Sequence, residues 1–564
     1  MNKNGEIADI FDNIADALEF KGENVFKINA YRKAARVLRE FPGDISKVKP
    51  AEIEGIGKGL AEKIEEYLAT GSIKKHAEAL SDIPEGLLDL LKIPSLGPKT
   101  LYYVYKELGV KGLSELEKVI EDGSLAQLDG MGEKKAENIR RGIELYKEGK
   151  SRIPIGLALP VVSEITSALK KVTKKASPAG SLRRMKETVG DIDILAADDN
   201  AEKIIEKFVT HPLVRSVNAR GNTKASVIVD FHNLQVDVRV VDEDSWGAAL
   251  VYFTGSKAHN VKIRSLAKDK NLKINEYGVF RGEKRIAGKT EEEVYKTLGM
   301  KWMPPELRED RGEIEASLKG NLPQLVELKD LKGDFHIHSN YSDGTNDIRT
   351  IVLAARDLGY EYVGICDHSK TSRIANGLDV NMLKKRNAEI DEVQEGIPGI
   401  RILKGTEVDI LSDGNLDYPD IVLEQLDFVI AAVHQGFRKN VTHRMKQAMD
   451  NPLVDVLAHP TGRLLSGREG YEINLEEVME HAAKRNVALE INATYDRLDL
   501  NDVNIMTAKS FGTVFIIGTD AHNIRMLRDT ELGIGMARRG WLVRKDILNA
   551  YTWDNIPLRR RRNR

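Results

Sequence analysis

Two aspartates, Asp191 and Asp193, stand two residues apart in an apolar-alternating run that is typical of a β-strand. Because alternate residues of a strand point to one face, both carboxylates should project together. A third aspartate, Asp237, lies in a second alternating run that could pair beside the first. Three carboxylates suit Mg²⁺, and two such ions can hold the attacking and leaving oxygens of an in-line phosphoryl transfer. The spacing therefore predicts a catalytic site for two Mg²⁺ ions.

The residues just before these aspartates could hold a nucleotide. Gly180-Ser181 fits a tight turn whose N–H groups and hydroxyl would bind the outer phosphates, and Arg184 adds a positive fork. Gly190 directly precedes the aspartates and belongs to the same nucleotide-binding set. An isolated Asp-x-Asp is more often a solvated pair on a surface strand. The Gly-Ser turn ahead and the strand-borne Asp237 behind favour nucleotidyl transfer instead.

Histidines and carboxylates mark a second site in the C-terminal half. Six of the chain's 12 histidines and three carboxylates stand near the ends of successive apolar runs: His336, His338, Asp343, His368, Glu407, His434, His459, Asp520 and His522. A lone histidine in a core is more often simply packed, but a set at successive strand ends favours a shared metal. Nine nitrogen and oxygen ligands exceed the needs of one ion. We therefore expect two or three divalent ions, Mn²⁺ or Zn²⁺, bridged by a carboxylate.

The elements that would position this second set alternate between strand and helix. Apolar, β-rich runs occupy residues 362–366, 400–404, 428–433, 454–458, 488–492 and 514–517, and helical stretches separate them. This alternation predicts a parallel barrel, whose active site gathers at the carboxyl ends of the strands. The one cysteine, Cys366, excludes an intramolecular disulfide and a Cys-based zinc site, and we expect it to pack in a buried strand.

The N-terminal region is helical by its pattern, because apolar residues such as Ile7, Phe11 and Ile14 recur at helix spacing. Three glycine turns in the region 1–150 each open a helical run with lysine close behind, and their glycines are Gly55, Gly57, Gly97, Gly130 and Gly132. Such a turn leaves backbone N–H groups free to face a phosphate without contacting a base. One turn is often only a connection. Three favour helix-hairpin-helix motifs and sequence-independent DNA binding.

The composition bounds the class of protein. A chain of 564 residues exceeds one hydrophobic core, and 30% charged with 41% hydrophobic residues is the balance of an ordinary soluble protein. The formal net charge of -2 means that a nucleic-acid surface must be a local patch. The first residues lack the apolar core of a signal peptide, and no apolar run is long enough to span a bilayer. We therefore expect a cytoplasmic monomer with no membrane partner.

From about Ile7 to Arg311 these features, in this order, resemble a family X DNA polymerase of the polymerase beta type. The resemblance includes the aspartates, the run Tyr252-Phe253-Thr254-Gly255-Ser256, and the triplet Asn275-Glu276-Tyr277. It implies gapped or primed DNA and dNTPs as substrates. It also implies a nucleotide pocket lined by Tyr252, Phe253, Gly255 and Asn260, with Arg264 reaching towards the template. Lys257 departs from the family pattern, which has an acidic residue there beside the base.

The same resemblance raises a second activity in the N-terminal region. Lys63 stands at the position of the family's Schiff-base lysine, and Lys27, Tyr31 and Lys75 match residues around that lyase site, which also binds DNA. A nucleophilic lysine must be partly neutral, and neighbouring cations would lower its pKa towards that state. The alternative is a lysine on the exposed face of a charged helix. Deoxyribose-phosphate lyase chemistry is thus an implication of the resemblance alone.

The C-terminal half resembles a PHP domain from Gly333 to about Trp553. The motifs include Asp-Phe-His-Ile-His-Ser, Cys-Asp-His-Ser, Gly-Thr-Glu-Val-Asp, Leu-Ala-His-Pro-Thr-Gly-Arg and Gly-Thr-Asp-Ala-His, and they fill all nine ligand positions of the family. The resemblance implies phosphoester hydrolysis by a 3′–5′ exonuclease, sometimes with abasic-site endonuclease or 3′-phosphatase activity. Arg373, Lys439 and Arg463 lie just beyond ligand motifs and could hold phosphates, although a solvated surface charge is the simpler role for each.

The expected fold is multidomain, α+β and α/β. We expect a helical 5′-phosphate and lyase domain at 1–80, fingers with helix-hairpin-helix motifs at 81–150, a catalytic palm at 151–245, a nucleotide-selecting thumb-type subdomain at 246–318, a linker at 319–332 and the PHP domain, a distorted (β/α)7 barrel, at 333–564. Two alternatives stay open. One is an RNA or antibiotic nucleotidyltransferase, and the other is a DNA-binding scaffold with a structural PHP domain.

Overall fold

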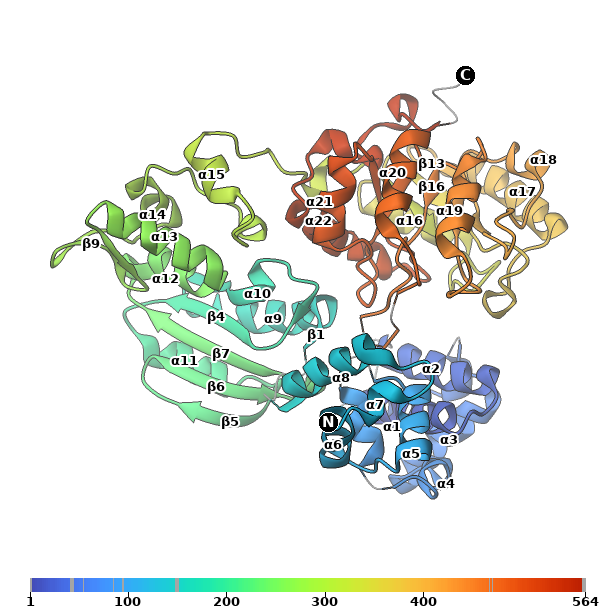
Figure 1. Cartoon of the computed structure of the whole chain (residues 1–564), viewed down its shortest axis with the longest axis horizontal. Coiled ribbons are helices and arrows are strands. Elements are labelled where there is room, and N and C mark those ends of the chain that lie inside the picture. The colour runs from blue at the N-terminus through green and yellow to red at the C-terminus, as the bar shows by residue number, and fades with distance from the viewer. Residues whose placement is uncertain are drawn as a thin grey trace. The chain divides into compact units, whose positions relative to one another are not determined.

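The computed structural model describes residues 3–40, 45–53, 55–84, 86–93, 96–147, 152–465, 467–468 and 470–559. The chain forms two compact units, residues 1–151 with 466–469, and residues 152–465 with 470–564 (Figure 1). Among the described residues, no helix is both long and apolar enough to cross a membrane.

The first unit is helical throughout its described part. Its first core joins α1 (Lys3–Phe20), α2 (Val25–Glu40), α3 (Lys58–Thr70) and α4 (Lys74–Leu80). A second core joins α5 (Pro98–Leu108), α6 (Leu113–Glu121), α7 (Ser124–Gln127) and α8 (Gly132–Lys147). The predicted helical periodicity is confirmed, since Ile7, Phe11 and Ile14 of α1 are fully buried.

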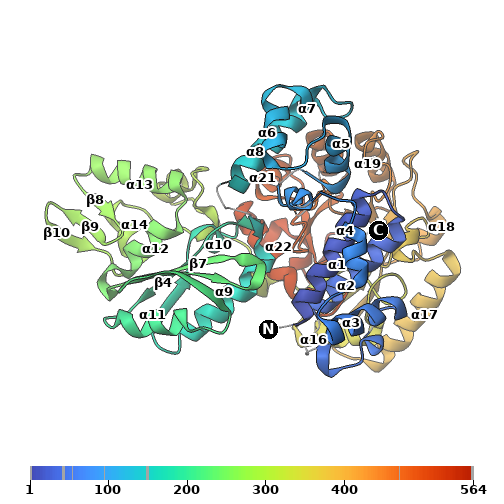
Figure 2. The same ribbon diagram turned by 90° about the horizontal axis from the view of Figure 1, so that it is seen from below.

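The second unit begins with a mixed five-stranded sheet in the order β2 (Lys175–Pro178), β4 (Ile192–Ala197), β7 (Gln235–Val241), β6 (Lys224–Val229), β5 (Val214–Arg220). One face is apolar because the alternate residues Val236, Val238 and Val240 of β7 pack with α9 (Ile155–Leu169) and α11 (Ala201–Val209). The other face carries the polar residues of β7. There α12 (Trp246–Thr254) packs on Leu195 of β4 (Figure 2). Strands β1 (Ile153–Pro154) and β3 (Thr188–Val189) form a separate, short antiparallel pair.

A smaller α/β layer follows α12. It comprises α13 (Lys257–Asp269), the antiparallel strands β8 (Lys273–Asn275), β9 (Gly278–Arg281) and β10 (Lys284–Ala287), then α14 (Glu291–Thr297) and α15 (Glu313–Leu318). Helix α12 approaches α14 so closely that a Cβ on Gly247 would lie 2.0 Å from the carbonyl carbon of Thr290. Glycine is therefore needed at 247 for this packing.

The remaining strands are parallel. β11 (Gly333–Ile337), β12 (Tyr362–Ile365) and β13 (Arg401–Lys404) form one sheet. The second contains β14 (Glu407–Asp409), β15 (Ile430–Ala432), β16 (Val456–Leu457), β17 (Ala488–Asn492) and β18 (Phe515–Gly518). Parallel bridges His368↔Glu407 and Ile337↔Ala521 join the two sheets at both edges. The sheets thus close into the distorted (β/α)7 barrel, in which β13 and β14 are two pieces of one strand.

The barrel's helices confirm the predicted alternation of strand and helix. They are α16 (Ile348–Asp357), α17 (Val380–Gly396), α18 (Asp420–Leu423), α19 (Val441–Asp450), α20 (Leu475–Arg485), α21 (Asp502–Ser510) and α22 (Thr530–Arg539). The break between β13 and β14 falls at Gly405, where a Cβ would lie 2.1 Å from the ring of Phe428. Cys366 is fully buried directly after β12, as expected.

Candidate active sites

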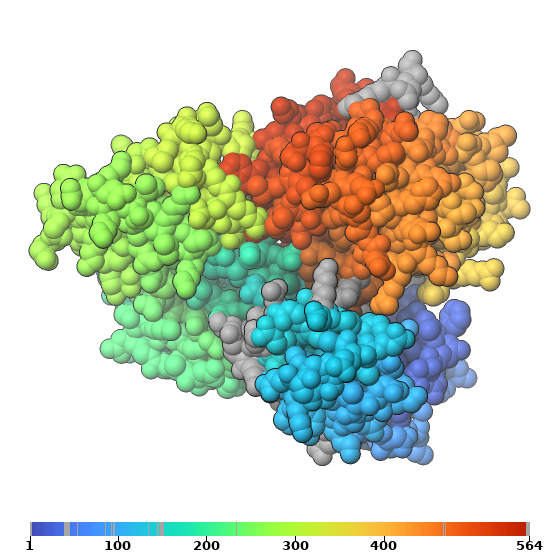
Figure 3. All heavy atoms as spheres, in the orientation of Figure 1, coloured from blue at the N-terminus to red at the C-terminus, as the bar shows by residue number. Residues whose placement is uncertain are grey.

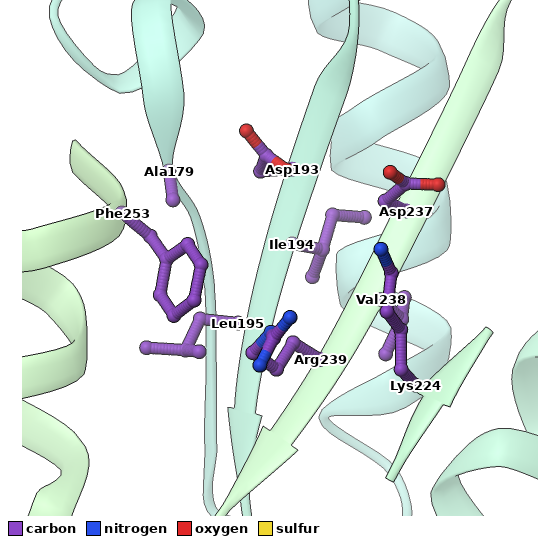
Figure 4. A pocket seen from close by; sticks show the side chains of 9 residues that line it. All are labelled: Ala179, Asp193, Ile194, Leu195, Lys224, Asp237, Val238, Arg239 and Phe253. Carbon is purple, nitrogen blue, oxygen red and sulfur yellow. The ribbon is translucent and has the colours of Figure 1, made fainter. Parts of the chain in front are cut away.

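Two strands of the five-stranded sheet bring the predicted aspartates together. Asp193 of β4 lies directly opposite Asp237 of β7 in a parallel register. Their carboxylates lie on the same side of the sheet (Figure 4). The prediction that Asp191 belongs to the strand is wrong by one residue, because β4 begins at Ile192 and Asp191 lies exposed in the bend before it. Carboxylates thus come from two neighbouring strands and the turn that leads into one of them.

The electrostatics of this face favour a bound cation. Burial, followed by the charges of Asp237 and Asp191, raises the pKa of Asp193 to about 6. A cation between the carboxylates would relieve that repulsion, so the donor set fits the predicted divalent ions. Two basic residues flank the site, Lys224 of β6 and Arg239 of β7, which lie opposite each other in the antiparallel register. Sequence reasoning missed both, although Arg239 shares the strand face of Asp237.

The Gly-Ser loop, residues 180–190, lies against these carboxylates. Gly180 has a φ of +60° and begins the single turn α10 (Gly180–Arg183). A Cβ on Gly180 would lie 3.0 Å from Oδ2 of Asp193. Both the left-handed backbone and the close approach require glycine here. Ser181 and Gly190, at the start and the end of the loop, are both partly exposed.

Several predicted nucleotide-pocket residues meet at the end of α12. Tyr252 and Phe253 lie in its last turn, and Gly255 ends it with a φ of +71°. Asn260 of α13 donates from Nδ2 to the Tyr252 carbonyl at 2.7 Å. A Cβ on Gly255 would lie 3.2 Å from Nη1 of Arg184, which donates to the Thr254 carbonyl. The Gly-Ser loop and the end of α12 are therefore one site. Arg264, one turn after Asn260, is exposed and donates to its carbonyl.

The neighbouring arginine, Arg183, anchors the Gly-Ser loop through an ion-pair network. Arg183 forms two hydrogen bonds to Glu291, at 2.7 and 2.9 Å, and the fully buried Arg308 forms two more, at 2.7 and 3.1 Å. Burial opposes ionisation of Glu291, but Arg308 and Arg183 hold its pKa well below the ordinary value. This ion-pair network ties the Gly-Ser loop to α14.

The nine predicted barrel ligands converge at the carboxyl ends of the strands. These residues form three groups, and within each group the possible ligand atoms, one nitrogen or oxygen per residue, lie within 4.8 Å of one another. The groups are His338 with Asp343, His368 and His522; His336 with His338 and Glu407; and His368 with Glu407 and His434. His459 Nε2 lies 2.9 Å from Glu407 Oε1, and Asp520 Oδ1 lies 3.1 Å from His338 Nε2. Glu407 belongs to two groups and contacts His459, so it is placed to bridge ions.

The cluster contains buried nitrogen and oxygen atoms that are available to bind metal ions. Several of its buried atoms lack a hydrogen-bond partner among the described residues, namely His336 Nε2, His338 Nδ1, Asp343 Oδ1 and His459 Nδ1. Burial, then the neighbours His368 and His522, lowers the pKa of His338 to about 4, which keeps its imidazole neutral and able to bind metal. His459 and Asp520 adopt positive φ values of 26° and 51°. Backbone strain of this kind gathers at functional sites.

Two carboxylates that sequence reasoning missed orient the histidines. Glu490 of β17 is fully buried and lies 2.5 Å from Nδ1 of His336, and its other oxygen accepts from the His459 amide. Asp409 of β14 lies 2.5 Å from Nδ1 of His434. Partners of this type fix the tautomer and direction of a metal-binding imidazole. The signal in the sequence was a charged residue inside each apolar strand.

The three basic residues expected near the barrel's phosphates differ in placement. Arg373 and Lys439 are exposed. Arg463 is instead bound in two hydrogen bonds to Glu187 of the Gly-Ser loop, at 2.6 and 3.2 Å, and to the Leu498 carbonyl. The simpler role expected for Arg463, a solvated surface charge, is therefore wrong, and a phosphate-binding role is not favoured either, because both of its terminal nitrogens already donate to Glu187 and the Leu498 carbonyl.

In the helical unit, an acid lies among the residues of the predicted lyase site. Lys75 donates to Glu78 at 3.1 Å, and this hydrogen bond, followed by the charges of Lys75, Lys74 and Lys63, lowers the pKa of Glu78. Tyr31 is buried, and its pKa is raised by burial and by Glu78. Lys63 donates to the Gly59 carbonyl at 2.8 Å, whereas Lys27 lies 3.8 Å from Glu23. Glu78 thus interacts electrostatically with three of the four predicted residues, Lys75, Lys63 and Tyr31, and is hydrogen-bonded to the first of them.

The glycine turns open helices as expected. Gly57 precedes α3, Gly97 precedes α5, and Gly132 is the first residue of α8. Gly55 and Gly130 adopt φ values of 89° and 71° in the turns before them. The first amides of each helix have no intrahelical acceptor, which is the geometry that phosphate binding uses.

Comparison with known proteins agrees with this architecture. Family models match residues 2–73 (helix-hairpin-helix domain), 87–144 (SAM-like helix-hairpin-helix tandem), 249–309 (DNA polymerase beta thumb) and 334–494 (PHP domain). The chain is 40% identical over 568 residues to the DNA polymerase/3′-5′ exonuclease PolX of Bacillus subtilis (strain 168), with 99% of each chain covered. DNA polymerase lambda of Arabidopsis thaliana is 25% identical over 54% of this chain and 62% of its own, and that of Rattus norvegicus is 26% identical over 55% and 56%.

A polymerase beta-like carboxylate site and a histidine-rich barrel in one chain define a class of two-centred phosphoryl-transfer proteins. Within that class, the chain belongs to the family X DNA polymerases that carry a C-terminal PHP domain.

Proposed function

We infer that this chain is a template-dependent DNA repair polymerase that fills short gaps and carries a 3′–5′ exonuclease in its barrel. The observation that carries this conclusion is the full-length likeness to a protein named for both activities. The geometry supports it, because each activity has an assembled cluster of ligands in the described part of the chain.

In the polymerase site, Asp191, Asp193 and Asp237 would hold two Mg²⁺ ions. When bound, such ions neutralise charge on the attacking and leaving oxygens of an in-line transfer. The chain's own groups then place the dNTP. Gly180, Ser181, Gly190 and Arg184 would hold its phosphates, while Tyr252, Phe253, Gly255 and Asn260 would line the sugar and base pocket, and Arg264 would reach the template.

In the barrel, the nine clustered residues would hold two or three Mn²⁺ or Zn²⁺ ions. When bound, ions of this kind lower the pKa of water and stabilise a departing 3′ oxygen. Glu490 and Asp409 would keep His336 and His434 directed at the site. The same centre could act on abasic sites or 3′ phosphates, because each presents a phosphoester.

In the helical unit, the three glycine turns would bind the phosphate backbone of gapped or primed DNA. Lys63 would be the Schiff-base nucleophile of a deoxyribose-phosphate lyase, with Lys27, Tyr31 and Lys75 around the 5′ phosphate. Monomeric state and cytoplasmic location stay predictions.

Primer extension on gapped DNA tests this function. A labelled primer before a short gap should be extended to fill it when dNTPs and Mg²⁺ are present, with the complementary dNTP preferred. Without dNTPs, the 3′ end should shorten, faster with Mn²⁺ than with Mg²⁺, because imidazole-rich sites suit transition metals. Untemplated addition would instead support the non-DNA nucleotidyltransferase, and absence of shortening would support a structural barrel.

A further inference from the structure

The barrel contacts the Gly-Ser loop at a run of neighbouring loop residues. Arg463 pairs with Glu187, and Arg539 at the end of α22 donates to the backbone carbonyl of Arg184 at 2.7 Å. Between them, α22 approaches Met185 so closely that a Cβ on Gly535 would lie 2.5 Å from the Met185 Cε. Three residues of the loop, Arg184, Met185 and Glu187, therefore contact the nuclease half of the chain.

Arg539 is the centre of this contact. Its side chain is 1% exposed. Its guanidinium donates three hydrogen bonds, one to a backbone carbonyl and two to carboxylates. Besides the Arg184 carbonyl, Nη1 donates to Glu309 at 2.9 Å, and Nη2 donates to Asp502 of α21. Asp502 also accepts from Arg311 at 2.9 Å. The planar fork of arginine can hold such acceptors in fixed directions, which lysine cannot.

Glu309 passes this contact to the nucleotide site. Its Oε1 accepts both from Arg539 and from Nε of Arg184, at 3.0 Å. The guanidinium of Arg184 is thus held on one edge by Glu309 and on another by the Thr254 carbonyl. Figure 3 shows the red atoms of the C-terminal helices against the yellow-green atoms of the chain near residue 310. The Arg539 side chain therefore contacts the backbone of Arg184 directly. It contacts the side chain of Arg184 indirectly, through Glu309.

We propose that Arg539, a residue of the nuclease barrel, is a positioning residue of the polymerase site that holds Arg184 where it binds the dNTP phosphates. The proposal rests on the proposed role of Arg184 in nucleotide binding. It makes the barrel a structural part of the polymerase, although the two ligand clusters share no residue. A bound metal in the barrel is not required for this role.

The neighbouring Arg538 provides a matched control. It also links α22 to segments on either side of α15, with hydrogen bonds to Glu306, before that helix, at 2.7 Å and to the Val326 carbonyl, after it, at 3.1 Å. Neither of these hydrogen bonds involves Arg184 or Glu309. A variant of Arg538 therefore weakens docking of α22 without touching the proposed positioning contact.

The test uses full-length Arg539→Met, Arg538→Met, Glu309→Gln and the double variant Arg539→Met/Glu309→Gln. Steady-state incorporation into a one-nucleotide gap gives KM for the dNTP and kcat, shortening of a 3′ end without dNTPs gives the nuclease rate, and thermal melting checks folding. We expect Arg539→Met to raise KM about tenfold or more, the scale of losing hydrogen bonds to charged groups, with kcat and the nuclease rate changed far less. Arg538→Met should leave KM unchanged.

The double variant should raise KM no more than the larger single variant, because both residues act through one contact. If Arg539→Met melts below the assay temperature, Glu309→Gln alone carries the test, since it keeps the bonds of Arg539 to Asp502 and the Arg184 carbonyl. Unchanged KM in Glu309→Gln and Arg539→Met, or an equal rise in Arg538→Met, would overturn the proposal. Arg184→Ala separates the two claims: if it raises KM while the others do not, only the positioning role fails, and if it has no effect, the proposed nucleotide site fails too.

Discussion

The two candidate active sites differ in the type and in the burial of their possible metal ligands. The palm offers two carboxylates on the polar face of a sheet and a third, exposed, in the bend before it, with no imidazole among them. The barrel buries six of its nine ligands and orients two of its histidines with Glu490 and Asp409. An exposed site of oxygen ligands shares its ions with substrate phosphates, whereas a largely buried, imidazole-rich site can hold ions before substrate arrives. This contrast predicts different responses to mutation.

The largest effect is expected in the palm, where few ligands are available. Asp237→Ala or Asp191→Ala should lower nucleotide addition by at least about 10²–10³-fold, the scale of removing a group that stabilises developing charge. Binding to gapped DNA should persist, because the glycine turns of the helical unit are intact. Single-turnover incorporation and a gel-shift titration measure the two. Wild-type incorporation by either variant would show that these aspartates are not the catalytic set.

In the barrel, the orienting carboxylate should matter almost as much as a ligand. Glu490→Gln keeps the shape but weakens the acceptor for His336, so we expect metal affinity to fall about 10–100-fold. Isothermal titration of the metal-free protein with Mn²⁺ measures this without relying on activity. Ile516→Ala, at the buried position opposite Glu490 in the neighbouring strand β18, provides a packing control. Equal affinities for wild type and Glu490→Gln would place the carboxylate outside the metal site.

The ion pairs of Glu291 with Arg183 and Arg308 stabilise the fold near the Gly-Ser loop, and their contribution to the free energy of unfolding should depend on pH. Glu291→Gln leaves Arg308 buried without a full counter-charge, so we expect a loss of about 3–5 kcal/mol in the free energy of unfolding. The folded-state pKa of Glu291 lies below its ordinary value of 4.5, so its contribution is present above that pH and is lost as the pH falls through the folded pKa. Chemical denaturation should therefore show the gap between variant and wild type narrowing below about pH 4.5. A gap that widens on acidification would contradict the assignment.

The smallest expected effect concerns chemistry that needs no metal. Lys63→Ala should abolish a borohydride-trapped adduct with an incised abasic site while leaving gap filling nearly unchanged, because only the proposed Schiff base is lost. Lys58→Ala, on the same helix, is the matched control. Trapping that persists in Lys63→Ala would assign the nucleophile to another amine. If wild type never traps, the helical unit only binds the 5′ phosphate.

Strand periodicity was sufficient to predict most of both ligand sets. The alternation around Asp193 and Asp237 predicted two strands with outward carboxylates, and their parallel pairing followed. Histidines at successive strand ends predicted one cluster because all strands of such a barrel end at one mouth. Asp191 was misplaced by one residue, since strand ends are the least determined by pattern.

The residues that support the sites were harder to predict. Glu490 and Asp409 carried a local signal, a charge within a buried apolar strand, which demands a partner. Arg539 carried none. Its partners Arg184, Glu309 and Asp502 are distant in sequence, and only the folded chain brings them together. Arg463 was misjudged for the same reason, because Glu187 lies 276 positions away.

The most direct test of the central claim compares His338→Ala/His459→Ala with Asp191→Ala in one gel assay. Labelled primer on gapped DNA is followed without dNTPs for degradation and with dNTPs for extension. We predict that the histidine variant loses degradation and still extends the primer, with more net product because nothing removes it, while Asp191→Ala degrades the primer and cannot extend it. Degradation that survives in the histidine variant and disappears in Asp191→Ala would place the nuclease in the palm and contradict this account.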